Sequence, residues 1–193
     1  MAAQQAMPAG GGVPGGTVAL DRWATGRNAL IALALVLVFV GLFIAARRLL
    51  GLKGAPSIGA PWPLASPGEL VDIAKRLGTD GRRGTVIVTL VLDTLFPLVY
   101  GAALAFSSGY LLARLNAPAP LRALRFIPLA AVVFDYLENL CIALLLGFYP
   151  RMNAAAGPLA VFTRGKWLLI FASTAVVLIA GAWLLARKVF GRG

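Results

Sequence analysis

The chain has 193 residues, of which 60% are hydrophobic, whereas soluble domains contain about 45–50% apolar residues. This composition indicates an integral membrane protein. The net charge of +11 does not point to nucleic acid, because most basic residues flank the apolar stretches and none forms a basic patch interleaved with aromatics in a soluble segment. The chain contains no histidine, which excludes His-ligated haem or chlorophyll, and we predict no cofactor and no metal site.

The N-terminal segment is rich in Gly, Pro and Ala and shows neither helical nor strand periodicity. We expect a flexible tail over 1–26 and a transmembrane domain over 27–189. The tail does not resemble a signal peptide, because no basic region precedes a short apolar run. If such a tail is ordered, a partner is needed to hold it.

Four apolar stretches have the length of about 20 residues that a membrane-crossing helix needs. They cover residues 29–50, 85–112, 121–148 and 167–186. Backbone groups in lipid must be satisfied within each segment, so these stretches are expected to be helices. The predicted fold is all-α, an antiparallel four-helix transmembrane bundle. Basic residues divide almost equally between the two sides, so the orientation in the membrane is undetermined.

The connection between the first two predicted spans begins with repeated prolines, which exclude a continuous helix there. A short helix is then predicted over 66–77, with a capping box at its start and an apolar face. Ser66 and Glu69 have the spacing of the box, and the face contains Leu70, Ile73 and Leu77. We expect this helix either to lie in the membrane interface or to pack on the end of the bundle. Residues 79–84 are predicted to turn the chain into the second span.

The second predicted span contains an acidic residue, Asp93, although a charge at the bilayer centre costs at least about 2.5 kcal/mol. Asp93, Pro97 and Tyr100 share one helical face. Pro97 has no amide hydrogen, so the carbonyl of Asp93 loses its helical partner and the helix is expected to kink.

The third predicted span contains Asp135, Glu138 and Asn139 on one face. Counted from the basic residues on the shared membrane side, Asp93, Asn139 and Glu138 lie at similar depths of roughly 15–20 Å. We therefore expect the two acidic motifs to meet, with hydroxyl donors from the fourth span at Ser173 and Thr174. No Lys or Arg is predicted at that depth, so the carboxyls are expected to be neutral and hydrogen-bonded, unless a cation or water fills a cavity beside them.

Part of the chain resembles a group of small four-span bacterial membrane proteins of uncharacterised function. The resemblance rests on the run SPGELVDIAKRLGTDGRR, on D-x-x-F-P-x-x-Y-G at 93–101 and on D-x-x-E-N at 135–139, and it covers roughly residues 66–145. It implies the four-span fold and the choice of polar residues, and it implies no activity.

These observations predict a non-catalytic protein of the bacterial inner membrane, an accessory or assembly subunit of a larger photosynthetic or respiratory complex. Its expected partners are membrane lipid and other membrane-protein subunits. In this interpretation the polar cluster fastens the helices together. Two alternatives remain: a small proton- or cation-coupled transporter that uses the intramembrane acids, and a membrane enzyme acting on a lipid or isoprenoid.

Overall fold

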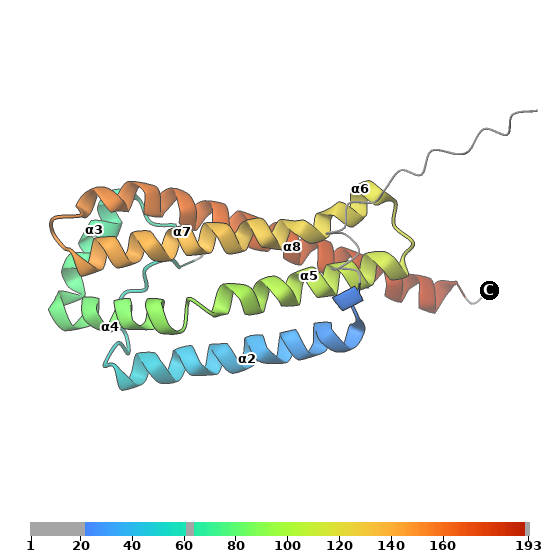
Figure 1. Ribbon diagram of the computed structural model, residues 1–193, viewed down its shortest axis with the longest axis horizontal. Coiled ribbons are helices and arrows are strands. Elements are labelled where there is room, and N and C mark those ends of the chain that lie inside the picture. Colours follow the sequence, from blue (N-terminus) through green and yellow to red (C-terminus); the bar gives the residue numbers. More distant parts are fainter. Residues whose placement is uncertain (1–21, 61–63, 192–193) are drawn as a thin grey trace, which may run out of the picture.

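The computed structural model describes residues 22–60 and 64–191, and the long elements in this part of the chain are all helices (Figure 1). The predicted tail lies, up to residue 21, outside the described residues. The helices are α2 (Gly26–Leu49), α3 (Pro67–Arg76), α4 (Gly78–Val91), α5 (Phe96–Arg114), α6 (Ala119–Arg122), α7 (Ile127–Gly147) and α8 (Ala156–Phe190), with the 3-10 turns η1 (Ala123–Phe126) and η2 (Asn153–Ala155).

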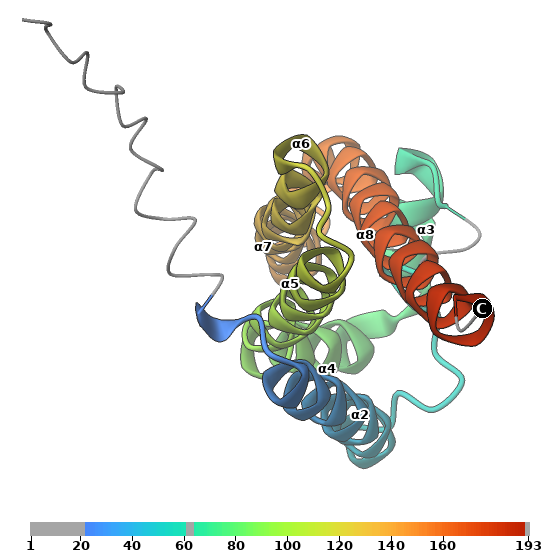
Figure 2. The same ribbon diagram turned by 90° about the vertical axis from the view of Figure 1, so that its right-hand side faces the viewer.

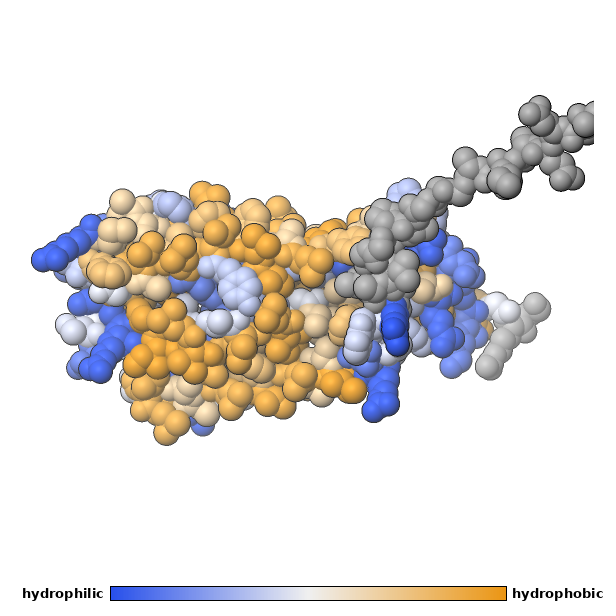
Figure 3. All heavy atoms as spheres, viewed as in Figure 1, coloured by the Kyte–Doolittle hydropathy of each residue, from blue (hydrophilic) through white to orange (hydrophobic). Residues whose placement is uncertain are grey.

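Four stretches of the described chain are long and apolar enough to cross a membrane, and this confirms the predicted fold class. These stretches are Gly26–Leu49, Phe96–Arg114, Ala119–Gly147 and Asn153–Phe190. On the face that Figure 3 shows, a broad apolar band covers the middle of the molecule, and hydrophilic residues gather at its two ends. Side chains such as Leu30 and Leu37 in this band are 69% and 73% exposed, as expected of a surface that faces lipid.

Helix α5 lies in the middle of the bundle, where it contacts α2, α7 and α8 (Figure 2). Helix α7 packs against α8 along much of its length and against α4 at one end. Helix α2 packs on α5 and to a smaller extent on α4. The bundle therefore consists of an α5–α7–α8 core with α2 added on one side.

The second predicted span is two helices rather than one kinked helix. Helix α4 ends at Val91 and α5 begins at Phe96, one residue before Pro97, which lacks an amide donor. Residues 79–84, predicted as a turn, belong to the start of α4. The turn is instead made at Gly78, whose φ of +65° suits glycine and separates α3 from α4.

Helix α8 begins at Ala156, well before the predicted start of the fourth span at Trp167. With 35 residues it is about 52 Å long, much more than the roughly 30 Å of a hydrocarbon core. Residues predicted as a connection before the span, among them Lys166, are therefore helical. Lys166 lies about 15 Å along the helix from its first residue.

Helix α3 packs on the end of the bundle, the second of its two predicted placements. Leu70 and Ala74 are buried in a cluster with α7 and α8, and Ile73 and Leu77 are half-buried. The predicted capping box is present: Ser66 Oγ accepts from the Glu69 amide at 3.3 Å, and Glu69 Oε2 accepts from the Ser66 amide at 2.7 Å. Hydrogen bonding of the Glu69 carboxylate by the Ser66 amide, and to a smaller extent by the Ser66 side chain, lowers the pKa of Glu69.

Two glycines allow α7 to approach its neighbours closely. A Cβ on Gly101 of α5 would collide with Val132, and a Cβ on Gly165 of α8 would collide with the ring of Phe134. Small residues at helix contacts are a common means of close packing in membranes. Both contacts lie within three residues of Asp135, so they bring α5 and α8 to the acidic part of α7.

Substitution of Gly165 tests this close contact. We expect Gly165→Ala to lower the free energy of unfolding by about 1–3 kcal/mol, because the new methyl group overlaps the Phe134 ring. The matched control is Gly157→Ala in the same helix, where a Cβ meets nothing within 4 Å and stability should be unchanged or higher. Denaturant unfolding in micelles measures both, and equal effects of the two variants would contradict the close contact.

Candidate functional site

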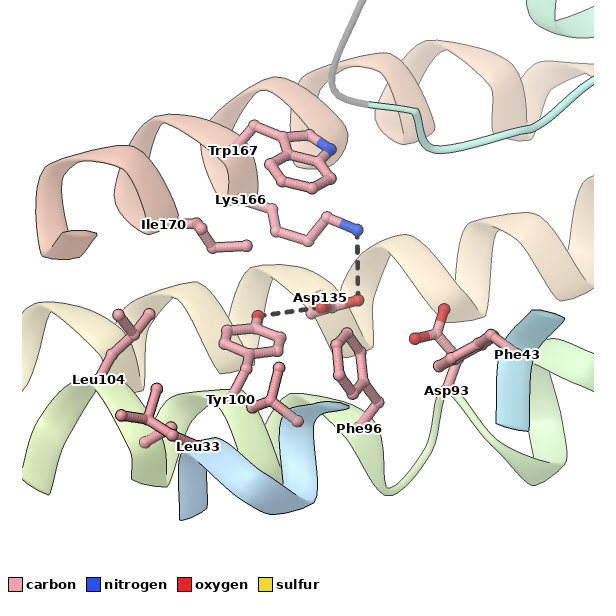
Figure 4. A pocket seen from close by; sticks show the side chains of 12 residues that line it. Leu33, Phe43, Asp93, Phe96, Tyr100, Leu104, Asp135, Lys166, Trp167 and Ile170 are labelled. Carbon is pink, nitrogen blue, oxygen red and sulfur yellow. Dashed lines mark hydrogen bonds and ion pairs between the residues drawn. The ribbon is translucent and has the colours of Figure 1, made fainter. Parts of the chain in front are cut away.

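A lysine from α8 lies among the carboxylates of α7. Lys166 Nζ forms an ion pair with Glu138 Oε2. It also lies 3.5 Å from Asp135 Oδ1, the contact drawn in Figure 4. Lys166 is 8% exposed, Asp135 2% and Glu138 0%. The prediction that no basic residue reaches the acids was therefore wrong. We call Lys166, Asp135 and Glu138 the ion triad.

The position of Lys166 on its helix explains why it points inward. The buried residues of α8 before and after it recur at spacings of four, three and seven, all of which return to one helical face, at Leu159, Thr163, Lys166 and Ser173. By its position, Lys166 was expected to flank the fourth span, because basic residues beside an apolar stretch commonly contact the lipid headgroups. Its phase with Thr163 and Ser173 was the signal that it belongs to the buried face.

Hydroxyl groups complete the hydrogen bonding of the two carboxylates in the triad. Tyr100 of α5 donates its hydroxyl to Asp135 Oδ2 at 2.9 Å, and Thr163 of α8 donates to Glu138 Oε1 at 2.7 Å. A buried ion pair is tolerated when such bonds satisfy the remaining lone pairs. Tyr100 was among the predicted residues, whereas Thr163 and Lys166 were not.

The segment between α2 and α3 passes directly over the triad. Trp167 Nε1 donates to the carbonyl of Gly59 at 3.0 Å, which fixes this segment to α8. Gly59 has a φ of +77°, and a Cβ there would lie 2.6 Å from Glu138 Oε1. The close approach and the positive φ both require glycine, so backbone rather than a side chain covers this carboxylate.

Side chains of α7 bond the backbone at the break between α4 and α5. Asn139 Nδ2 donates to the carbonyl of Asp93 at 2.8 Å, and the Tyr136 hydroxyl donates to the carbonyl of Thr94 at 2.8 Å. The carbonyl that Pro97 leaves without a helical partner therefore accepts an amide of Asn139. Tyr136 was not among the predicted residues of the polar cluster, and its bond was not foreseen.

The two predicted donors of the fourth span do not join the carboxylates. Ser173 Oγ donates to the carbonyl of Leu169 at 2.7 Å, and Thr174 Oγ1 donates to the carbonyl of Ile170 at 2.8 Å. Both hydroxyls bond within their own helix, as Ser and Thr in helices commonly do. That expectation was wrong, and Thr163, located earlier on α8, supplies the hydroxyl instead.

An apolar pocket of about 400 Å³ adjoins the triad (Figure 4). Its walls come from α2, α5, α7, α8 and the α4–α5 break, and they include Leu33, Phe43, Phe96, Leu104 and Ile170. The polar groups that border it are Asp93, Tyr100, Asp135 and Lys166. Figure 4 shows the carboxylate of Asp93 on the same side of the pocket as Phe43.

Acidic groups outnumber basic ones at the polar end of the pocket. Asp93 and Asp135 line this end together with the single ammonium of Lys166, and Glu138, which pairs with Lys166, lies behind them outside the pocket lining. Within residues 22–60 and 64–191, no hydrogen bond or ion pair reaches the carboxylate of Asp93. In a medium of low dielectric this imbalance attracts positive charge or hydrogen-bond donors. The described residues contain no group of three or more Cys, Asp and Glu side chains arranged to hold a metal ion.

Comparison with family models, with curated proteins and with solved structures gave no match. The fold itself gives the class of protein. The chain is an α-helical integral membrane protein with four candidate membrane-spanning helices. The resemblance to small four-span bacterial proteins, stated from the motifs, stays a prediction.

Loss of the Asn139 amide tests the role of α7 at the helix break. We expect Asn139→Leu to lower the free energy of unfolding by about 1–3 kcal/mol, because the carbonyl of Asp93 is then buried without a donor. Thr94→Val is the matched control, since the Thr94 hydroxyl bonds the carbonyl of Leu90 and leaves the Asp93 carbonyl untouched. If unfolding in micelles shows the same small change for both variants, the proposed role of Asn139 is wrong.

Proposed function

We propose that this protein binds an amphipathic molecule from the bilayer, with a head group that is cationic or donates hydrogen bonds. The observation that carries the proposal is the apolar pocket that ends at two carboxyls, those of Asp93 and Asp135, and at Lys166, which is paired with the buried Glu138 behind it. Its volume of about 400 Å³ falls in the range of about 300–1,000 Å³ typical of small-molecule sites. Apolar walls with a few convergent polar groups are the usual composition of such sites.

The placement of the pocket supports entry from the lipid. Two of its walls are α2 and α8, and α2 packs mainly on α5 while α8 packs mainly on α7. The pocket therefore lies between two helices that are not each other's main partners (Figure 2). Leu33, one of its lining residues, is 46% exposed on the apolar surface of α2. An alkyl or isoprenoid chain reaches the pocket through this side without crossing water.

The charges of the site favour one class of head group over another. The carboxylate of Asp93 has no partner in the described part of the chain, so an ammonium or hydroxyl head placed there gains a charge-assisted hydrogen bond. A carboxylate or phosphate head meets an excess of negative charge in the same place and is disfavoured. We therefore assign amines and alcohols with an apolar chain as the ligand class.

The interpretations made from the sequence fit this proposal to different degrees. A pocket that reaches the carboxyl cluster is the feature expected of a protein that acts on a lipid or isoprenoid, and we propose binding without assigning a reaction. An accessory role in a bacterial membrane complex stays a prediction, and it is compatible with binding. Native mass spectrometry of the protein purified from its own membranes detects a bound amphiphile and a stoichiometric partner in one experiment.

Quenching of Trp167 fluorescence tests the ligand class, because Trp167 lines the pocket. The full chain carrying Trp23→Phe, Trp62→Phe and Trp183→Phe retains this single tryptophan. In lipid nanodiscs, brominated dodecylamine and dodecanol should quench it saturably, with apparent affinities at least about tenfold higher than that of brominated dodecanoate. Asp93→Asn should remove the preference for the amine.

The control for this experiment is Asp80→Asn, which removes an exposed carboxylate at the start of α4, away from the pocket. This variant should quench like the unaltered chain. Equal affinity for dodecylamine and dodecanoate, or the absence of saturable quenching, would refute the proposed function.

A further inference from the structure

A second cavity lies on the other side of the ion triad. Its volume is about 350 Å³, and it lies between α3, α8 and the segment that joins α2 to α3. Glu69 and Arg76 of α3 and Arg164 of α8 line it, and all three are exposed residues. This cavity is at the hydrophilic end of the molecule that contains α3 (Figures 1 and 3). We call it the interfacial cavity, and the pocket beside Asp93 the membrane pocket.

Polar contacts connect the two cavities through the protein. Thr163 lines the interfacial cavity and donates its hydroxyl to Glu138 Oε1 at 2.7 Å. Glu138 Oε2 is paired with Lys166 Nζ, which also contacts Asp135 Oδ1 at 3.5 Å. Lys166 and Asp135 line the membrane pocket. Every residue between the two cavities thus carries a group that accepts or donates a proton.

We propose that Thr163, Glu138 and Lys166 form a proton path from the interfacial cavity to the membrane pocket. The inference goes beyond ligand binding, because the path ends on Asp135 whether or not the pocket is occupied. It requires no oxidant and no cofactor. The path also gives a role to Glu138, which is fully buried and does not line the membrane pocket.

Each transfer along the path conserves atoms and charge. A hydronium ion in the interfacial cavity gives a proton to the Thr163 oxygen and becomes water, and Thr163 passes its own hydroxyl proton to Glu138 Oε1. The protonated Glu138 carboxyl then rotates about its Cγ–Cδ bond, which brings the proton to the position beside Lys166 Nζ. The Lys166 ammonium gives one of its protons to Asp135 Oδ1 and receives the Glu138 proton in its place. One proton has then moved from the interfacial cavity to Asp135, and the Lys166 ammonium is restored.

Titratable side chains from the elements packed around the ion triad also lie near this path. Asp135 and Cys141 are on α7 with Glu138, Tyr100 faces Asp135 from α5, and Asp93 lies at the α4–α5 break. Toward α6 the membrane pocket is lined by Ala103 and Leu104, which carry no protons to exchange. The path therefore approaches the triad from the α3 end.

The backbone at Gly59 lies against the carboxylate of Glu138 and also lines the interfacial cavity. Trp167 fixes this segment through the carbonyl of Gly59, and the glycine lies against Glu138 Oε1 without a side chain. Thr163 is therefore the group that offers Glu138 a hydroxyl from the interfacial cavity. This arrangement makes the Thr163 hydroxyl the step at which the path is most easily interrupted.

Time-resolved infrared spectroscopy of the full chain in nanodiscs, without added amphiphile, tests the path. Protons are released by light from a caged compound, and protonation of Asp135 and Glu138 is followed by the loss of their carboxylate absorption. Asp135→Asn and Glu138→Gln assign the bands. Thr163→Val keeps the shape of the side chain without its hydroxyl and should slow protonation by about tenfold or more.

Two further variants separate the path from a structural effect. Thr163→Ser retains a hydroxyl and should keep the original rate, and Thr174→Val removes a hydroxyl of α8 that bonds within its own helix, so it should leave the rate unchanged. The proposal is overturned if Thr163→Val protonates as fast as the unaltered chain, if Thr163→Ser is as slow as Thr163→Val, or if no carboxylate band responds. Because no amphiphile is present, failure here is distinct from failure of the tryptophan quenching experiment.

Discussion

The structure depends on the pairing of Lys166 with Glu138 and Asp135 inside a membrane-spanning bundle. Three charges buried to this extent are costly in lipid unless they satisfy one another. The ion pair therefore sets the distance and the rotation between α7 and α8. Gly165 permits the required approach, and the hydroxyls of Tyr100 and Thr163 occupy the remaining lone pairs. The packing of small residues and the electrostatics of the triad thus require the same arrangement of helices.

The same arrangement gives the site its two proposed properties. The triad closes one end of an apolar pocket that borders lipid, and on its other side it contacts a cavity at the hydrophilic end of the molecule. Binding of an amphipathic head group uses the excess of carboxyls, whereas proton transfer uses their contact with Thr163. Asp93 takes part in the first and stands outside the second, so substitutions can separate the two.

Much of this fold was predictable because length and apolarity determine a membrane helix. The presence of four apolar spans and the capping box at Ser66 follow from local rules that a sequence exposes. Pro97 predicted a kink, and the structure has a break between two helices there. The inward direction of Lys166 was indicated only by its helical phase with Thr163 and Ser173, and its place beside an apolar stretch pointed the other way, since a basic residue there normally marks the membrane boundary. Lys166 lies well inside a helix because α8 begins ten residues before it. The length of α8 depends in turn on its packing against α7 and α3. The pocket depends on tertiary packing in the same way.

The central claim, that Lys166 is the buried counter-charge of Glu138, is tested most directly by a double-mutant cycle for unfolding in micelles. Lys166→Met alone should lower the free energy of unfolding by about 3–5 kcal/mol, because it leaves buried carboxylates without their cation. Addition of Glu138→Gln to that variant should recover part of the loss, which gives a coupling energy of about 1–3 kcal/mol. Strictly additive effects of the two substitutions would contradict the ion pair and the account built on it.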